Sequence, residues 1–109
     1  MSFSFHPEAE RELDEAVAYY EQSQSGLGIE FAEEVYATIL RIIQYPNAWT
    51  KLSSNTRRCL MNRFPYGVVC QAKSDTVRVI AVANLNRRPG YWSGRLADTR
   101  GPHEGSGTE

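Results

Sequence analysis

The sequence predicts a single α+β domain, in which a short N-terminal strand and a helical hairpin precede three antiparallel strands that form a sheet packed against the two helices. Three observations lead to this fold class. Residues 2–5 alternate polar and aromatic side chains, residues 7–44 repeat apolar side chains every three or four positions, and residues 57–83 divide into three strand-like runs. A chain of 109 residues suits one domain with one hydrophobic core.

The first predicted helix follows the strand at residues 2–5. Pro7 suits the first helical position because its missing N–H is not needed there, and Glu8 suits the positive end of the helix dipole. One face of the helix is apolar and consists of Ala9, Leu13, Ala16, Val17 and Tyr20. Polar residues are expected to face outward, among them Glu8, Glu12, Glu15 and Gln22. We expect this helix to end near Gln24.

A second helix is predicted after the two glycines of residues 25–28, because so short a break favours two helices folded back on each other. Its apolar arc is wider than that of the first helix and consists of Phe31, Val35, Tyr36, Ile39, Leu40, Ile42 and Ile43. It should therefore be the more buried helix. Pro46 ends it, since the residue before a proline is displaced from helical geometry.

The second half of the chain is predicted to form the sheet. Residues 47–56 are mostly polar and are expected to form a loop, and strands follow at residues 57–63, 67–73 and 76–83. The short link at residues 74–75 predicts a hairpin between the last two strands. The domain is expected to occupy residues 1–96. Residues 97–109 have almost nothing to bury and are predicted to form a disordered tail.

The charges divide along the chain, although the net charge is only −1. Residues 1–50 hold nine acidic residues against two arginines, a net charge of −7, whereas residues 51–100 hold ten basic residues against two acidic ones, a net charge of +8. This asymmetry suggests a basic half that contacts an anionic partner. The alternative is that the two halves neutralise each other by packing together, and the sequence leaves both open.

Residues 86–95 are the densest cluster of chemically versatile side chains. Three arginines and two large aromatic residues fall within ten positions. A buried unpaired charge costs several kcal/mol or more, so a core segment would not carry so many guanidinium groups. We therefore expect this stretch to lie on a contact surface.

Other kinds of site receive little support from the sequence. Cys59 and Cys70 lack CxxC spacing and a histidine cluster, so they are expected to be reduced, packed thiols, and no metal site or cofactor is predicted. His6 is expected to have a capping or solvent role, and His103 lies in the Gly-rich tail. No apolar run approaches the roughly 20 residues that a membrane helix needs, and the N-terminus lacks the features of a signal peptide. The expected location is the cytoplasm, with no membrane association.

The order of these elements resembles the RelE/ParE superfamily of bacterial toxins, over about residues 3–95. The residues Arg63-Phe64-Pro65-Tyr66 lead the second strand of the predicted sheet, and Arg88-Pro89-Gly90-Tyr91-Trp92 follow the last one. The supporting segments are residues 16–21, Gly28 with Phe31 in the second helix, Tyr45-Pro46 at its end, and the apolar residues 81–83.

The resemblance implies the toxin of a type II toxin–antitoxin module, associated with plasmid stabilisation and held inactive in a complex with its cognate antitoxin. RelE-like members are ribosome-dependent mRNA endoribonucleases, whereas ParE-like members inhibit growth by poisoning DNA gyrase without cutting RNA. Fold alone does not choose between these activities. A third possibility is a degenerate member that binds its antitoxin and has lost toxicity, as the near-neutral charge and missing basic positions would allow.

Two departures from the RelE-like pattern favour the ParE-like reading. RelE-like nucleases tend to carry an arginine where this chain has Gly67, and Lys51 and Lys73 are its only lysines. If the protein is a nuclease, its catalytic residues are expected to be Arg87, Arg88 and Tyr91. Tyr91 would act as a base only if nearby arginines lowered its pKa from the ordinary value near 10. The residues expected to bind a target or nucleic acid are Arg57, Arg58, Arg63, Trp92 and Arg95.

Overall fold

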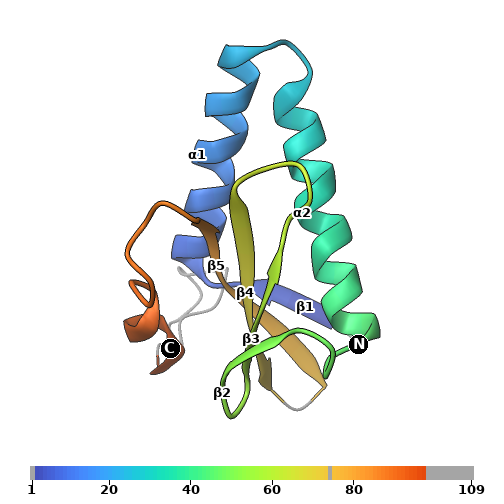
Figure 1. Ribbon diagram of the computed structural model, residues 1–109, viewed down its shortest axis with the longest axis vertical. Coiled ribbons are helices and arrows are strands. Elements are labelled where there is room, and N and C mark those ends of the chain that lie inside the picture. Colours follow the sequence, from blue (N-terminus) through green and yellow to red (C-terminus); the bar gives the residue numbers. More distant parts are fainter. Residues whose placement is uncertain (1, 74, 98–109) are drawn as a thin grey trace, which may run out of the picture.

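The computed structural model describes residues 2–73 and 75–97 of the chain. Its elements are β1 (Ser2–Phe5), α1 (Pro7–Ser23), α2 (Leu27–Gln44), β2 (Thr50–Ser53), β3 (Thr56–Leu60), β4 (Tyr66–Lys73), β5 (Thr76–Asn84) and the short 3₁₀ helix η1 (Ser93–Ala97). The strands form one sheet in the order β1-β5-β4-β3-β2 (Figure 1). The predicted α+β class is confirmed. The predicted tail lies outside the described residues, except for Ala97, the last residue of η1.

The sheet contains one strand more than the sequence predicted. Residues 47–56 were expected to form a loop, but Thr50–Ser53 pair with β3 as the antiparallel edge strand β2. All four residues of β2 are exposed, so the strand has no alternation of buried and exposed side chains to reveal it. At the opposite edge β1 runs parallel to β5, whereas the other strand pairs are antiparallel.

His6 joins β1 to α1. Its backbone N–H donates to the Val79 carbonyl of β5 at 2.8 Å, and its side chain Nδ1 accepts the Glu8 N–H at 3.0 Å. The side chain therefore caps one of the free N–H groups that begin every helix. His6 is fully buried, and its predicted capping role is confirmed.

The two helices approach closely where the hairpin turns. Gly26 has φ of 89°, a left-handed conformation that favours glycine, and Gly28 lies against α1. A Cβ atom at Gly28 would stand 2.6 Å from the Val17 carbonyl oxygen. The Glu21 carboxylate accepts the N–H groups of Gly26 and Gly28, so α1 itself caps the start of α2.

The main core lies between the helices and one face of the sheet. Its most buried members include Phe31, Val35, Ile39, Val68 and Val79. A register shift between β4 and β5 pairs Val69 with Ala81 and Cys70 with Val79. Ile80 and Ala81 consequently both belong to a smaller cluster on the other face, where residues 91–96 cover them. This bulge gives the C-terminal segment an apolar surface on which to pack.

Candidate functional site

The C-terminal segment, residues 85–97, packs on the face of the sheet opposite the helices. Tyr91, Trp92 and Leu96 contact the small cluster formed by Val69, Ile80, Ala81 and Ala83. Gly90 has φ of 77°, so the chain turns at a position where glycine is favoured. The Gln71 side-chain amide donates to the Leu96 carbonyl at 3.3 Å and fixes the end of the segment to β4.

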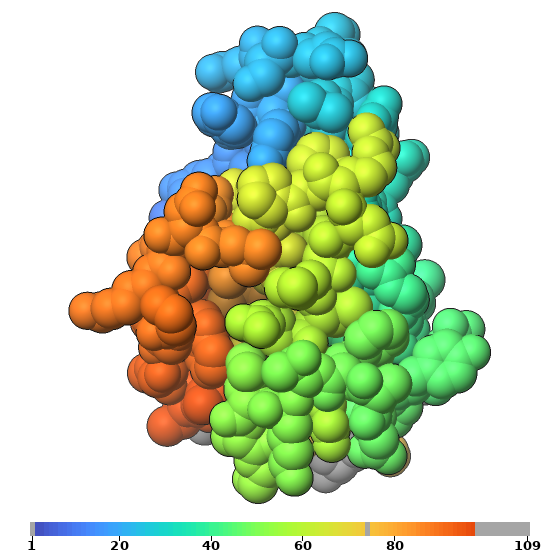
Figure 2. Space-filling model, viewed as in Figure 1, coloured from blue at the N-terminus to red at the C-terminus, as the bar shows by residue number. Residues whose placement is uncertain are grey.

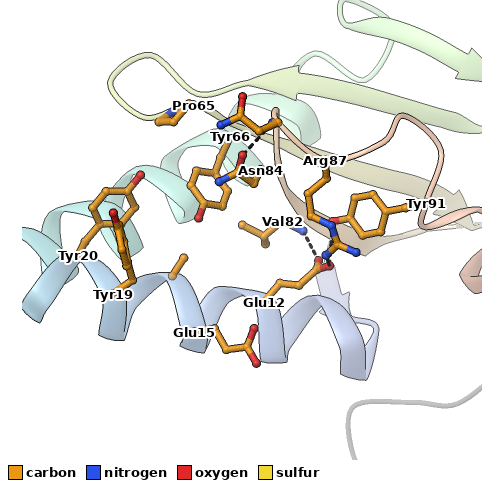
Figure 3. Close-up of a pocket in the computed structure, with 12 residues that line it drawn as sticks. Glu12, Glu15, Tyr19, Tyr20, Pro65, Tyr66, Val82, Asn84, Arg87 and Tyr91 are labelled. Atoms are coloured by element: carbon orange, nitrogen blue, oxygen red, sulfur yellow. Dashed lines mark hydrogen bonds and ion pairs between the residues drawn. The ribbon is translucent and has the colours of Figure 1, made fainter.

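Glu12 of α1 is the buried acid that anchors this segment. Its side chain is only 7% exposed, and its carboxylate accepts the Val82 N–H at 3.0 Å and the Tyr91 hydroxyl at 2.8 Å (Figure 3). Arg95 donates to both carboxylate oxygens at 3.1 and 3.0 Å. The prediction that Glu12 faces outward was wrong, because Glu12 lies three residues after Ala9 and four before Ala16, on the buried side of the helix.

Glu12 and Arg95 together form hydrogen bonds with backbone groups at an unpaired edge of the sheet. β1 pairs only with residues 76–79, so the edge of β5 is open beyond Val79. There the Val82 N–H donates to Glu12, and the Ile80 carbonyl accepts from Arg95 at 3.0 Å. The side-chain pair therefore replaces the hydrogen bonds of a missing strand. The Arg95 side chain, expected to contact a target, is 14% exposed and is held by this internal partner.

The environment of Tyr91 raises its pKa. Burial is the largest cause, followed by the hydrogen bond to Glu12 and the negative charge of that carboxylate. The charges of Arg95 and Arg87 act in the opposite direction but do not reverse the shift. Tyr91 consequently keeps its proton at neutral pH, and its hydroxyl is occupied as a donor to Glu12. The condition under which Tyr91 would act as a base is not met.

Arg87 is held more loosely than Arg95. Its guanidinium carbon lies 3.8 Å from the centre of the Tyr91 ring, and its Nη1 atom lies 3.8 Å from Glu12 Oε2. The Arg87 side chain remains 52% exposed, and Arg88 is exposed as well. Both guanidinium groups are therefore available to a partner.

A groove lies between the C-terminal segment and strands β3 and β4, on the helix-free face of the sheet. We call it the Arg58–Trp92 groove; its volume is about 140 Å³. Figure 2 shows the hollow between the orange C-terminal segment and the yellow-green strands. The lining residues are Leu52, Arg58, Val69, Ala83, Asn84, Leu85, Arg87, Arg88, Pro89, Gly90, Tyr91 and Trp92. Three are arginines and none is acidic, so the groove combines apolar surface with positive charge.

Arg58 contributes an unsatisfied donor to this groove. Its Nε atom is buried and has no hydrogen-bond partner among the described residues. The aliphatic part of its side chain packs over Gly67, since a Cβ atom at Gly67 would lie 3.3 Å from Cγ and Cδ of Arg58. Leaving a buried donor unpaired costs about 1–3 kcal/mol. An acceptor supplied by a bound partner would remove that cost.

The structure separates the other predicted contact residues from the groove. Arg57, next to Arg58, lies on the opposite face of β3 and donates to the Trp49 carbonyl at 3.1 Å. Arg63 lies in the turn before β4 and pairs with Glu30 of α2 at 2.7 Å. Of the residues that the sequence predicted, Arg58, Arg87, Arg88, Tyr91 and Trp92 line the groove, whereas three arginines do not: Arg57, Arg63 and Arg95.

Part of the charge asymmetry is neutralised within the molecule. Arg63, Arg87 and Arg95 each pair with an acidic residue of the helices. In the described part of the chain, Arg57, Arg58 and Arg88 form no ion pair. Both interpretations of the asymmetry therefore hold in part, and the unpaired arginines include two that line the groove.

A metal-binding cluster or a membrane-spanning helix within residues 2–73 and 75–97 would indicate a different kind of site. These residues contain no cluster of three or more His, Cys, Asp or Glu side chains that could hold a metal ion. None of the described helices is both long and apolar enough to cross a membrane.

Comparison with known proteins identifies the family. A sequence model of the ParE toxin of the type II toxin–antitoxin system parDE matches residues 3–89. The chain belongs to the ParE toxin family. A solved chain described as the chromosomal ParDE toxin–antitoxin system from P. aeruginosa has a similar fold, with a TM-score of 0.56 and 12% sequence identity over 79% of this chain and 97% of that chain. Among curated protein sequences, none matches this ParE-family toxin significantly.

Proposed function

We propose that this ParE-family toxin inhibits bacterial growth by binding a macromolecular target through the Arg58–Trp92 groove, and that a cognate antitoxin neutralises it in a complex. The family resemblance makes DNA gyrase in the cytoplasm the expected target. The observation that carries the proposal is the groove itself. It presents Arg58, Arg87 and Arg88 beside an exposed apolar surface, with no acidic residue in its lining.

The same site supports binding better than RNA cleavage. Attack by a ribose 2′-hydroxyl needs a group that accepts a proton and another that returns one to the leaving oxygen. Arg87, Arg88 and Tyr91 do share one wall of the groove, but the Tyr91 hydroxyl donates to Glu12 and its pKa is raised. The lining contains no His, Asp or Glu side chain that could take its place.

Expression without an antitoxin tests this function. We expect slowed growth with elongated cells and intact mRNA, and inhibition of supercoiling by purified gyrase on addition of the purified protein. Arg58→Ala and Arg88→Ala should each weaken gyrase inhibition about tenfold, the loss expected from one charge-assisted contact of about 1.4 kcal/mol. Arg57→Ala is the matched control, because it removes a neighbouring arginine from the opposite face of β3.

The outcomes separate the candidate functions. Rapid cleavage of translated mRNA would replace the gyrase target with the RelE-like activity. Normal growth with soluble, folded protein would indicate the degenerate, antitoxin-binding member. If Arg57→Ala abolished toxicity while Arg58→Ala and Arg88→Ala retained it, the groove would be the wrong surface.

A further inference from the structure

A second hollow lies between α1 and the ends of β4 and β5 (Figure 3), and its lining shares Asn84, Arg87 and Tyr91 with the Arg58–Trp92 groove. We call it the α1–β5 hollow; its volume is about 460 Å³. Its lining includes two small residues, Ala16 and Val82, which are 4% and 1% exposed and leave the space between the helix and the sheet unfilled. A hollow of this size accommodates a large side chain and adjoining backbone.

Three tyrosines gather at one end of the hollow. The rings of Tyr19 and Tyr20 lie 5.1 Å apart at 78°, and those of Tyr20 and Tyr66 lie 6.2 Å apart at 66°. Tyr20 also stacks on Phe31 at 5.2 Å, so the core holds it in place. Burial and the neighbouring Tyr66 and Tyr19 hydroxyls raise the pKa of Tyr20, as expected where phenol groups converge. Within residues 2–73 and 75–97, none of these three hydroxyls has a hydrogen-bond partner.

The rim of the hollow offers one carboxylate oxygen to a cation. Glu15 stands at its rim, 65% exposed, with one carboxylate oxygen bonded to Arg11 at 2.7 Å and the other without a partner among the described residues. Glu12 closes the far end. Arg87 is the one basic residue in the described lining, and it already lies against Glu12 and the Tyr91 ring. Glu12 is already paired with Arg95, so an entering anion would meet the Glu15 carboxylate, whereas an entering cation would meet aromatic rings and the free carboxylate oxygen of Glu15.

The hollow also adjoins a backbone acceptor that a polypeptide could reach. It borders the edge of β5 beyond β1, where the Val82 N–H points towards Glu12. In a strand the N–H and C=O of one residue point to the same side, so the Val82 carbonyl faces this edge too. Because Glu12 and Arg95 already bond the Val82 N–H and the Ile80 carbonyl, the Val82 carbonyl is the group here to which a partner could donate an N–H while its side chain enters the tyrosine end.

From these features we propose that the α1–β5 hollow receives an arginine or lysine side chain of a protein partner. The tyrosine rings contact the cation, Glu15 pairs with it, and an N–H group of the chain that carries it donates to the Val82 carbonyl. This hollow adjoins the Arg58–Trp92 groove, and its proposed occupant does not depend on the identity of the growth target.

Ligand pairs that differ only in charge test the proposal. The intact protein, labelled with ¹³C in its tyrosine rings, is titrated with N-acetyl-arginine N-methylamide and with the citrulline analogue, which has nearly the same shape and no charge. We expect the arginine compound to shift the Tyr19, Tyr20 and Tyr66 signals at millimolar concentrations, and citrulline to bind at least about fivefold more weakly. Equal affinities, or shifts confined to other tyrosines, would overturn the proposal.

Substitutions locate the site. Tyr19→Ala and Glu15→Gln should each weaken binding about fivefold, whereas Tyr19→Phe, which keeps the ring, should bind as the natural protein does. Tyr45→Ala is the control, because Tyr45 is as exposed as Tyr19, at 61% against 62%, and lies beyond the end of α2. Unchanged affinity in folded Tyr19→Ala would show that the tyrosine end of the hollow does not bind the cation.

A final comparison tests the partner class. A short peptide with a central arginine should bind more tightly than the arginine amide, because its additional backbone N–H groups can donate to the Val82 carbonyl. If free spermidine bound more tightly than this peptide, the hollow would be a polyamine site and the proposed protein partner would be wrong.

Discussion

Arg95 and Glu12 form a bidentate ion pair, although the two residues are 83 positions apart in the sequence. The two side chains are 14% and 7% exposed, so the pair lies inside the molecule. It joins the first helix to the C-terminal segment and sets Tyr91 and Arg87 beside the sheet. The shape of the Arg58–Trp92 groove therefore depends on a residue of α1 that is not in its lining.

Replacing Glu12 by Gln should destabilise the protein strongly. The substitution leaves Arg95 buried without a carboxylate, and breaking one side of a buried ion pair costs about 3–5 kcal/mol. The free energy of unfolding in urea measures the loss. Glu8→Gln is the control, because Glu8 pairs with Arg11 on the surface, and such pairs contribute at most about 1 kcal/mol. Equal losses in the two variants would contradict a central role for Glu12.

Tyr91 should make stability depend on alkaline pH. Its pKa is raised in the folded state, so the folded protein keeps a proton that the unfolded chain loses near pH 10. The stability from the protonated phenol is complete below that pH and falls as the pH rises above it. Unfolding at about pH 9 and about pH 11 should show a smaller decline for Tyr91→Phe than for the natural protein. Identical declines would place the titrating groups elsewhere.

The same Tyr91→Phe variant bears on the activity. If the protein acts by binding, the folded variant should remain toxic, because the phenylalanine ring still packs on the sheet and beside Arg87. Growth after induction measures this, with circular dichroism to verify folding. Complete loss of toxicity in a folded variant would favour a chemical role for the hydroxyl.

Gly28→Ala should weaken the helical hairpin. The added methyl group would lie 2.6 Å from the Val17 carbonyl oxygen, so the helices must move apart, at a cost of about 1–3 kcal/mol. Thermal unfolding followed by circular dichroism gives the change. Gly94→Ala should behave as the natural protein does, because a methyl group there has no atom within 4 Å. If Gly28→Ala left the unfolding temperature unchanged, the two helices would be able to move apart at little cost.

Both thiols should be unreactive in the folded protein. Cys59 and Cys70 are buried and free, and burial, followed by the nearby Cys59, raises the pKa of Cys70. Because the thiolate is the reactive form, modification by Ellman's reagent should await unfolding. Labelling rates with and without urea test this. Rapid labelling without denaturant would show that the sheet opens readily.

The elements that the sequence predicted well are those whose pattern repeats locally. Pro7 and Pro46 bracket the two helices, and the apolar spacing between them reports which faces are buried. The edge strand β2 escaped prediction because all its residues are exposed and its only partner is β3. A strand of that kind is defined by its pairing, which no local pattern encodes.

The residue types of the candidate site could be predicted from the sequence, but the role of each residue could not. The density of arginine and aromatic residues at positions 86–95 predicted a contact surface, which stays a prediction, but the cost of burying a guanidinium group applies only to an unpaired one. Glu12 supplies the pair from the other end of the chain. The spacing of Glu12 from Ala9 and Ala16 was the one local signal. An acidic residue on an apolar helix face indicates that a cation from a distant part of the chain pairs with it.

The ion pair also sets an order of events during synthesis. Glu12 leaves the ribosome long before Arg95, so α1 and the sheet can assemble while the carboxylate still lacks its cation. The second side-chain hydrogen bond at the edge of β5, from Arg95 to the Ile80 carbonyl, forms only after the last described residues have left the ribosome. A growing chain consequently carries an unfinished groove, and the surface to which we attribute toxicity is completed only after residues 85–97 have been translated.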